Sequence, residues 1–282
     1  MAPQSSYDIS DSEFQKLADL IYNHAGIRLK DTKKNLVKSR LKKRLKKLEL
    51  DSFKQYHDRV LEDQTGKELS YLLQAISTNV TSFFREQKHF DFLEDRVVPE
   101  VLNQYNTTSE RTYIHLWSAA CSTGQEPYSM AISLLESVPN PSNYRIKVLG
   151  TDISHEALRS ARRGVYREKD VEDMDKIVRD RYFEKIQKNG ETMYRIKTRV
   201  RNLVKYGRLN LNGRSFPFSK KFDVIFCRNV TIYFDKPVVQ NLINRFERYI
   251  KSGGYLFMGH SESLAGIDHD LDFVQATIYR NA

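Results

Sequence analysis

The sequence predicts an α/β protein in which a doubly wound, Rossmann-like sheet follows a small N-terminal all-helical domain and carries an inserted antiparallel β subdomain. From residue 114 onward, apolar runs suited to buried strands alternate with helical patterns, as in parallel βα units. Residues 8–76 show helical periodicity with short breaks, whereas residues 182–198 show a hairpin pattern. The expected division is a helical domain over 1–76, a linker over 77–90 and an α/β domain over 91–282, with about seven strands and the insertion at about 180–198.

A strongly basic amphipathic helix is expected over residues 32–48 of the N-terminal domain. Its apolar stripe lies at helical spacing and consists of Val37, Leu41, Leu45 and Leu48. At about 100° per residue, the side chains on the opposite face include Lys42, Lys43 and Lys46. A solvated helix face is the ordinary explanation of such charges, and a docking surface for an acidic partner is the alternative.

The linker is a candidate part of a binding site. Residues 77–81 are polar and β-branched without a helical period, and Phe83, Phe84 and Arg85 follow them. Two adjacent phenylalanines are usually core residues. Because a ligand is often enclosed between domains, we single out Arg85 as the residue of interest here.

The first βα unit of the α/β domain spans residues 114–135. An apolar strand is followed by a turn of small residues at 121–125, and Pro127 suits the first turn of the next helix. Small residues let backbone N–H groups approach a ligand closely. Only Gly124 remains of the usual G-x-G-x-x-G pattern, so an ordinary strand–helix turn explains this stretch equally well on its own.

Later strands are expected at 145–152, 204–210, 222–227 and 255–258, with a turn at 252–254 and an antiparallel edge strand at 273–279. The second of the expected parallel strands ends in Asp152. An acid at this point can accept hydrogen bonds from ribose hydroxyls, although it can also cap the helix that follows.

Composition limits the function classes. The chain of 282 residues has a formal net charge of +10, which favours an acidic partner: nucleic acid, an anionic membrane surface or an acidic protein. It contains no apolar run of about 18 residues and no signal-peptide pattern, so we expect no membrane insertion. Its two cysteines, Cys121 and Cys227, are expected to be buried and unpaired, as in a cytoplasmic protein. There is no Ser-His-Asp set, metal-ligand spacing or Walker loop.

Four motifs in order carry a resemblance to a known family. They are TNVTSFFRE at 78–86, SAACSTGQEPYSMA at 118–131, TDIS at 151–154 and FCRNVTIYF at 226–234. Together they closely resemble the chemotaxis receptor methyltransferases, over roughly residue 8 to the C-terminus. This resemblance implies a Rossmann-like methyltransferase domain that uses S-adenosyl-L-methionine, releases S-adenosyl-L-homocysteine and methyl-esterifies glutamate side chains of chemotaxis receptors.

The resemblance also implies a set of site residues. Those expected to contact the cofactor are Asn79, Thr81, Arg85, Glu126, Asp152, Asn210, Leu211, Arg228 and Asn229. Glu126 would meet the ammonium of the methionine part and Asp152 the ribose hydroxyls, while Asn210 and Leu211 would flank the adenine. Arg85 and Tyr233 are the expected catalytic residues, which orient the incoming carboxylate. Taken singly, Glu126 could be a helix N-terminal acid, Tyr233 a core aromatic and Arg228 a surface charge.

The resemblance implies that the partner is the cytoplasmic helical bundle of a chemotaxis receptor. We expect a monomeric enzyme that docks on this bundle through Lys42, Lys43 and Lys46 and that binds no nucleic acid. Two departures from the family are visible. This chain has Thr231 where the family commonly has Met, and only Gly190 in the insertion, where some members use a glycine-rich loop to dock a receptor tail.

Two other functions compete with this one. A nucleic-acid methyltransferase would fit the basic charge, but C-R-N-V stands where an N-P-P-Y-like motif would close the fourth strand. A non-catalytic adaptor of the same fold is the second alternative. The combined presence of Arg85, Glu126, Asp152, Arg228 and Tyr233 argues against it.

Overall fold

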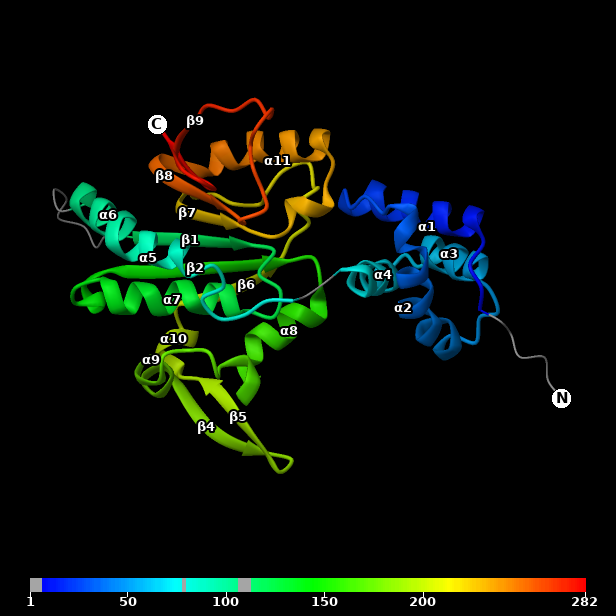
Figure 1. Cartoon of the computed structure of the whole chain (residues 1–282), viewed down its shortest axis with the longest axis horizontal. Coiled ribbons are helices and arrows are strands. Elements are labelled where there is room, and N and C mark those ends of the chain that lie inside the picture. The colour runs from blue at the N-terminus through cyan, green and yellow to red at the C-terminus, as the bar shows by residue number, and fades with distance from the viewer. Residues whose placement is uncertain (1–6, 78–79, 106–112) are drawn as a thin grey trace.

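The computed structural model describes residues 7–77, 80–105 and 113–282. An N-terminal group of four α-helices lies at one end of the molecule, beyond the ends of the central strands (Figure 1). These helices are α1 (Asp11–Ala25), α2 (Lys34–Lys47), α3 (Phe53–Glu62) and α4 (Lys67–Ile76). They bury a hydrophobic cluster of their own, which contains Phe14, Leu17, Phe53 and Leu72. In the described residues, no helix is long and apolar enough to cross a membrane.

Local signals set the bounds of the first two helices. Ser10 and Glu13 form a capping box at the start of α1, and Gly26 ends it in the left-handed conformation at φ +71°. The predicted basic helix is α2, preceded by a 3₁₀ turn at Asp31–Lys33. Its stripe packs as predicted: Val37, Leu41 and Leu45 are fully buried and Leu48 is half-buried.

The central sheet confirms the predicted Rossmann-like fold. Its seven strands run in the order β6-β2-β1-β7-β8-β10-β9. Their bounds are β1 Tyr113–Ala119, β2 Arg145–Asp152, β6 Val204–Arg208, β7 Phe222–Cys227, β8 Ile250–Met258, β9 Leu271–Gln275 and β10 Ile278–Asn281. The pairs within β6-β2-β1-β7-β8 are parallel, and β10 and β9 add antiparallel pairs. The chain moves outward in opposite directions from β1 and β7, so their boundary is the switch point where such sheets bind ligands.

Helices cover both faces of the sheet, and alternate side chains of β1 show how. Ile114 and Leu116 join a core cluster on the face covered by α6 (Val98–Tyr105) and α7 (Gln125–Ser137). Trp117 joins the cluster on the face covered by α11 (Lys236–Tyr249), where its ring meets that of Phe246 edge-on at 5.3 Å. Shorter elements complete the α/β domain: α5 Lys88–Phe92, a π turn at Leu93–Val97, and α8 His155–Arg163.

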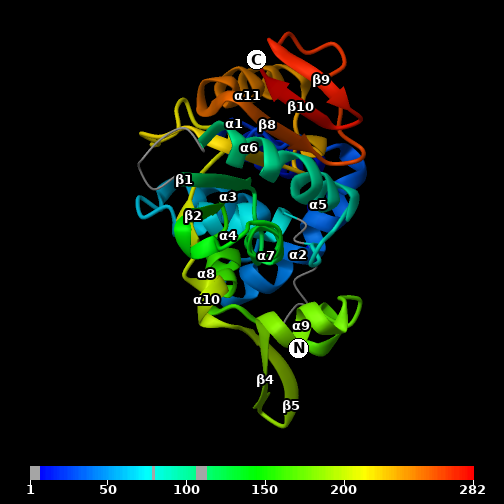
Figure 2. The same cartoon turned by 90° about the vertical axis from the view of Figure 1, so that its left-hand side faces the viewer.

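The predicted insertion is a three-stranded antiparallel sheet in the order β3-β5-β4. Its elements are β3 Val165–Arg167, α9 Lys176–Tyr182, β4 Phe183–Lys188, β5 Glu191–Ile196 and α10 Thr198–Arg201. The predicted hairpin is β4–β5, turning at Asn189 and Gly190, both with positive φ. The insertion projects at the opposite end of the molecule from the C-terminal strands (Figure 2). The three-residue strand β3 was not predicted, because it is too short to show a period.

Two predictions for the C-terminal region are wrong. Residues 273–279 do not form one edge strand, because Thr277 adopts φ +66° and reverses the chain between β9 and β10. Residues 252–254 do not form a turn between elements. They lie within β8, where the pairing with β7 shifts register and Gly253 adopts φ +74°.

Candidate active site

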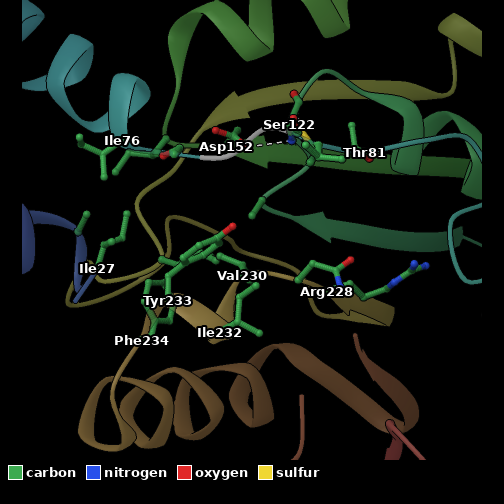
Figure 3. Close-up of a pocket in the computed structure, with 18 of the residues that line it drawn as sticks. Ile27, Ile76, Thr81, Ser122, Asp152, Arg228, Val230, Ile232, Tyr233 and Phe234 are labelled. Carbon is green, nitrogen blue, oxygen red and sulfur yellow. Dashed lines mark hydrogen bonds between the residues drawn. The ribbon is translucent and has the colours of Figure 1, made fainter. Parts of the chain in front are cut away.

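A cavity of about 360 Å³ lies at the carboxyl ends of β1, β2, β6 and β7. The linker and the helical domain close it from the other side, through residues that include Ile27, Leu36 and Ile76. Predicted site residues that line it are Thr81, Arg85, Glu126, Asp152, Asn210, Leu211, Arg228, Asn229 and Tyr233. Asn79 lies outside the described residues. Figure 3 shows Asp152, Ser122 and Thr81 on one side of the cavity, with Arg228 and Tyr233 on the opposite side.

The turn after β1 is built from unusual backbone conformations. Ala120, Ser122 and Gly124 all have positive φ, and Gly124 precedes the first residue of α7. A Cβ atom on Gly124 would lie 2.8 Å from the Cβ of Ala161 on α8. The glycine is therefore needed both for the turn and for the close packing of α8, and the turn presents its backbone to the cavity.

Asp152 anchors this turn. Its Oδ2 accepts a hydrogen bond from the Ser122 N–H, and its Oδ1 accepts one from the Ser154 N–H, both at 2.8 Å. Burial raises the pKa of the carboxyl group, although these backbone N–H groups oppose the shift. The alternative that Asp152 caps α8 is wrong, because the capping side chain is Ser154, which accepts from the Ala157 N–H. Each Asp152 oxygen keeps a lone pair for a ligand hydroxyl.

Arg228 lies between two carboxylates. Its Nε is 3.6 Å from an oxygen of Glu126, and its Nη2 is 3.4 Å from one of Glu86. Nη2 also donates to the backbone carbonyl of Arg85. Only 1% of the Arg228 side chain is exposed, so the alternative of a surface charge is wrong. Nε and Nη1 are buried and have no hydrogen-bond acceptor among the described residues, so the guanidinium acts on its surroundings mainly through its charge.

The two acids beside Arg228 have opposite pKa shifts. Burial raises the pKa of Glu126, whose Oε1 accepts a hydrogen bond from Ser118 Oγ at 2.6 Å. Burial also pushes the pKa of Glu86 upward, but the charge of Arg228 and hydrogen bonds from Asn229 and the His260 backbone leave it lowered. Glu86 was not predicted as part of the site, although it follows Arg85 directly.

The loop that carries Asn229 and Tyr233 is held by a residue that was not among those predicted. Glu262, which is buried, accepts hydrogen bonds from the backbone N–H groups of Gly259, Asn229, Val230 and Thr231, at 2.6 to 2.9 Å. The Thr231 hydroxyl donates a further bond of 2.7 Å. Thr231, which replaces the usual Met of the resembled family, therefore has its own polar contact. Glu262 lies far along the chain in an unpatterned loop, so no local signal marks it.

Arg85 and Tyr233 reach the cavity from different segments. Arg85 Nη1 donates to the Val80 carbonyl at 2.9 Å, which folds its side chain against the linker. Tyr233 ends a 3₁₀ turn (Thr231–Tyr233), and its backbone carbonyl accepts from the Arg28 N–H of the helical domain at 2.9 Å. Its ring projects into the middle of the cavity (Figure 3). Both side chains are half-buried and can reach a group that enters the cavity.

Asn210 and Leu211 have structural partners as well as a place in the cavity. Asn210 Nδ2 donates to the His24 carbonyl at 2.5 Å, which joins the sheet to the helical domain, and its Oδ1 accepts from the Asn212 N–H. Leu211 is buried in the same core cluster as Trp117. The docking candidates Lys42, Lys43 and Lys46 do not line the cavity, and all are exposed on α2.

Comparison with known proteins agrees with this geometry. The family model "CheR methyltransferase, SAM binding domain" matches residues 79–280, and "CheR methyltransferase, all-alpha domain" matches residues 12–77. A "Chemotaxis protein methyltransferase" of Borreliella burgdorferi is 40% identical, over 97% of this chain and 95% of that protein. A "Probable chemotaxis protein methyltransferase" of Rhizobium etli is 40% identical, over 93% and 96%. The Escherichia coli "Chemotaxis protein methyltransferase" is 35% identical, over 96% and 91%.

Asp152→Ala should weaken S-adenosylmethionine binding at least about tenfold, because hydrogen bonds to a charged group contribute about 1.5–3 kcal/mol each and 1.4 kcal/mol is tenfold. Titration calorimetry on the folded variant measures this. Asp175→Ala is a matched control, since Asp175 also accepts two backbone N–H bonds, from Ile177 and Val178, but lies outside the cavity. Undiminished affinity in Asp152→Ala would remove this residue from the binding site.

Glu262→Gln should lower both stability and turnover, because a carboxamide has one acceptor oxygen and turns its NH₂ group toward backbone donors. A buried donor left unpaired costs about 1–3 kcal/mol. Denaturant unfolding and steady-state kinetics measure the two effects. Thr231→Val should show a weaker form of both losses, and Thr231→Ser, which keeps the hydroxyl, should show neither. Equal behaviour of the Val and Ser variants would argue against a role for this hydrogen bond.

Proposed function

Since this chain belongs to the CheR methyltransferase family, we propose that it is the enzyme that forms methyl esters on glutamate side chains of chemotaxis receptors, with S-adenosylmethionine as methyl donor. The observation that carries this proposal is the cavity at the switch point of the sheet, which Arg85 and Tyr233 line together with the proposed cofactor residues. The test is to incubate the protein with labelled cofactor and receptor membranes and to measure alkali-labile methanol. Its release marks a carboxyl ester, which neither a nucleic-acid methyltransferase nor an adaptor would form.

The side chains around the cavity suit S-adenosylmethionine. The volume of about 360 Å³ is that of a small-molecule site. The positive charge of Arg228 suits the carboxylate of the methionine part, and the Glu126 carboxylate suits its ammonium. Asp152 has lone pairs for ribose hydroxyls, and Leu211 gives an apolar contact for a base. When bound, this cofactor supplies an electrophilic methyl group on a sulfonium.

Positioning is the main task left to the protein. A glutamate side chain is ionised at neutral pH, with a reference pKa of about 4.3, and so attacks without a general base. Arg85 attracts this carboxylate, and the Tyr233 hydroxyl donates a hydrogen bond that aligns it. The helical domain and linker exclude water from the cavity. Orientation of this kind can lower a barrier by about 7–11 kcal/mol at its best.

We assign receptor docking to the face of α2 that bears Lys42, Lys43 and Lys46. These side chains are exposed, and their charge suits an acidic surface, such as a helical receptor bundle that presents target glutamates. Arg28, Lys30 and Lys33 line the cavity from the helical domain, so basic side chains also lie beside the proposed methyl-transfer site. We further propose that the protein acts as a monomer in the cytoplasm. Its two cysteines are buried and unpaired, as expected of a reducing compartment.

Tyr233→Phe and Arg85→Ala should each lower kcat about tenfold or more, with a smaller effect on cofactor affinity, because both side chains are assigned to the carboxylate. Single-turnover methylation and calorimetry separate the two quantities. Tyr249→Phe is the matched control, since its hydroxyl bonds to the Phe216 carbonyl and lies outside the cavity. If both variants methylated receptor at the parent rate, the transfer site would lie elsewhere.

Changing Lys42, Lys43 and Lys46 together to Glu should raise KM for receptor several-fold, with little effect on cofactor affinity or melting temperature, because exposed charges contribute little to folding. The parent should also lose receptor activity between about 0.05 and 0.5 M salt, as the Debye length falls well below 10 Å. A control triple change of the exposed Lys205, Lys220 and Lys221 to Glu alters net charge equally. The docking role would be contradicted if KM for receptor did not change in the α2 variant, or if it changed equally in both triple variants. This face of α2 would then be an ordinary solvated surface.

A further inference from the structure

Glu86, His89 and His260 converge beside Arg228, and they are not among the residues that line the cavity. Glu86 lies in the segment before α5, His89 lies on α5, and His260 follows β8. Glu86 Oε2 is 3.4 Å from His89 Nδ1 and 3.8 Å from His260 Nε2. The three atoms lie within 4.8 Å of one another.

His89 Nε2 lies 2.8 Å from Thr277 Oγ1, and the tautomer of the ring decides which of the two atoms donates. When the Thr277 hydroxyl donates to the Ala276 carbonyl, 2.6 Å away, it accepts from His89 Nε2. With the proton on Nε2, the lone pair of Nδ1 faces the Glu86 carboxylate.

In this tautomer two acceptor atoms face each other. His89 is only 2% exposed, and among the described residues neither its Nδ1 nor the Oε2 atom of Glu86 has a hydrogen-bond partner, while Glu86 Oε1 accepts from Asn229. Two lone pairs at 3.4 Å repel unless a cation or a shared proton lies between them. Arg228 Nη2 is 3.4 Å from the same Glu86 oxygen, but it also balances Glu126, so among the described residues two carboxylates share one guanidinium. The local charge therefore leaves room for a further cation.

We propose that Glu86, His89 and His260 form a binding site for a divalent transition-metal ion, best matched by Zn²⁺. Imidazole nitrogen and carboxylate oxygen are ordinary zinc ligands, with bonds of about 2.0–2.2 Å. Ligand atoms at the corners of a tetrahedron with such bonds are about 3.4 Å apart. The distances from Glu86 Oε2 are close to this value, and the exposed His260 ring needs only a small movement to complete the set.

The surroundings of His89 resemble the support of a metal ligand. A ligating histidine usually donates its other ring N–H to an acceptor that fixes the tautomer, and here Thr277 Oγ1 lies 2.8 Å from Nε2 and can accept this bond. His89 is also held edge-on against Phe257, at 5.5 Å between ring centroids. His89, which is buried, and Glu86, whose side chain is 10% exposed, thus supply the enclosed half of the site, while His260 supplies the accessible half and leaves a coordination position open to water.

The test is metal binding by the untagged full-length protein. We expect one equivalent of Zn²⁺ in calorimetry, a rise in melting temperature with Zn²⁺, and visible absorption of a tetrahedral complex when Co²⁺ is added instead. His260→Gln should lower Zn²⁺ affinity at least about tenfold, a loss typical even of a supporting residue, and remove the Co²⁺ signal. His155→Gln, which replaces another exposed histidine, should change neither. Methyl transfer by metal-free His260→Gln should equal that of the metal-free parent, which shows that the variant is folded.

Two results would overturn the proposal: no saturable Zn²⁺ binding by the parent at stoichiometric concentration, or equal Zn²⁺ affinity in the parent and His260→Gln. Glu86→Gln gives a second arm, because it removes the charged ligand while the fold is checked by circular dichroism. Retained affinity in that folded variant would also count against the site.

Discussion

The buried guanidinium of Arg228 is the interaction on which the site depends. A charge with only 1% of its side chain exposed is stable only when paired, and its partners come from separate segments. Glu126 lies at the start of α7, and Glu86 and the Arg85 carbonyl lie in the segment before α5. One side chain after β7 therefore fixes the first βα turn and the linker relative to each other. Loss of the guanidinium would leave two buried carboxylates without their countercharge.

Two carboxylates, those of Glu262 and Asp152, hold the backbone of the loops around the cavity. Glu262 gathers the N–H groups that follow Arg228, and so fixes the loop between the guanidinium and Tyr233. Asp152 does this for the turn after β1 through the Ser122 N–H. Both loops lie at the switch point, where strands end and backbone groups need partners. The cavity is therefore shaped by acids that bind protein backbone, and of the two only Asp152 lines it and can offer its remaining lone pairs to a ligand.

The parts of the fold and site that could be predicted are those with local signals. The apolar run of β1, the acid at the end of β2 and the stripe of α2 each depend on neighbouring residues. Glu262 and the Glu86–His89–His260 cluster could not be found in this way, because their partners are distant in sequence and only folding brings them together. The division of the C-terminal segment into β9 and β10 depends on the backbone conformation of Thr277, which is rare for a β-branched residue.

Closure of the site by a separate helical domain follows from the chemistry. Methyl transfer to a carboxylate needs no acid–base pair, so the structure must align the reacting groups and exclude water from them. The contacts between the domains meet this need at the reacting end of the cavity: Tyr22 Oη donates to Asp235 at 2.7 Å, and the Arg28 N–H donates to the Tyr233 carbonyl. Tyr233 is thus held by the same domain that carries the basic α2 face. Under the docking proposed above, a receptor would meet a surface whose position relative to Tyr233 is already set. Recognition of the receptor and alignment of its carboxylate would then depend on the same contact between the domains.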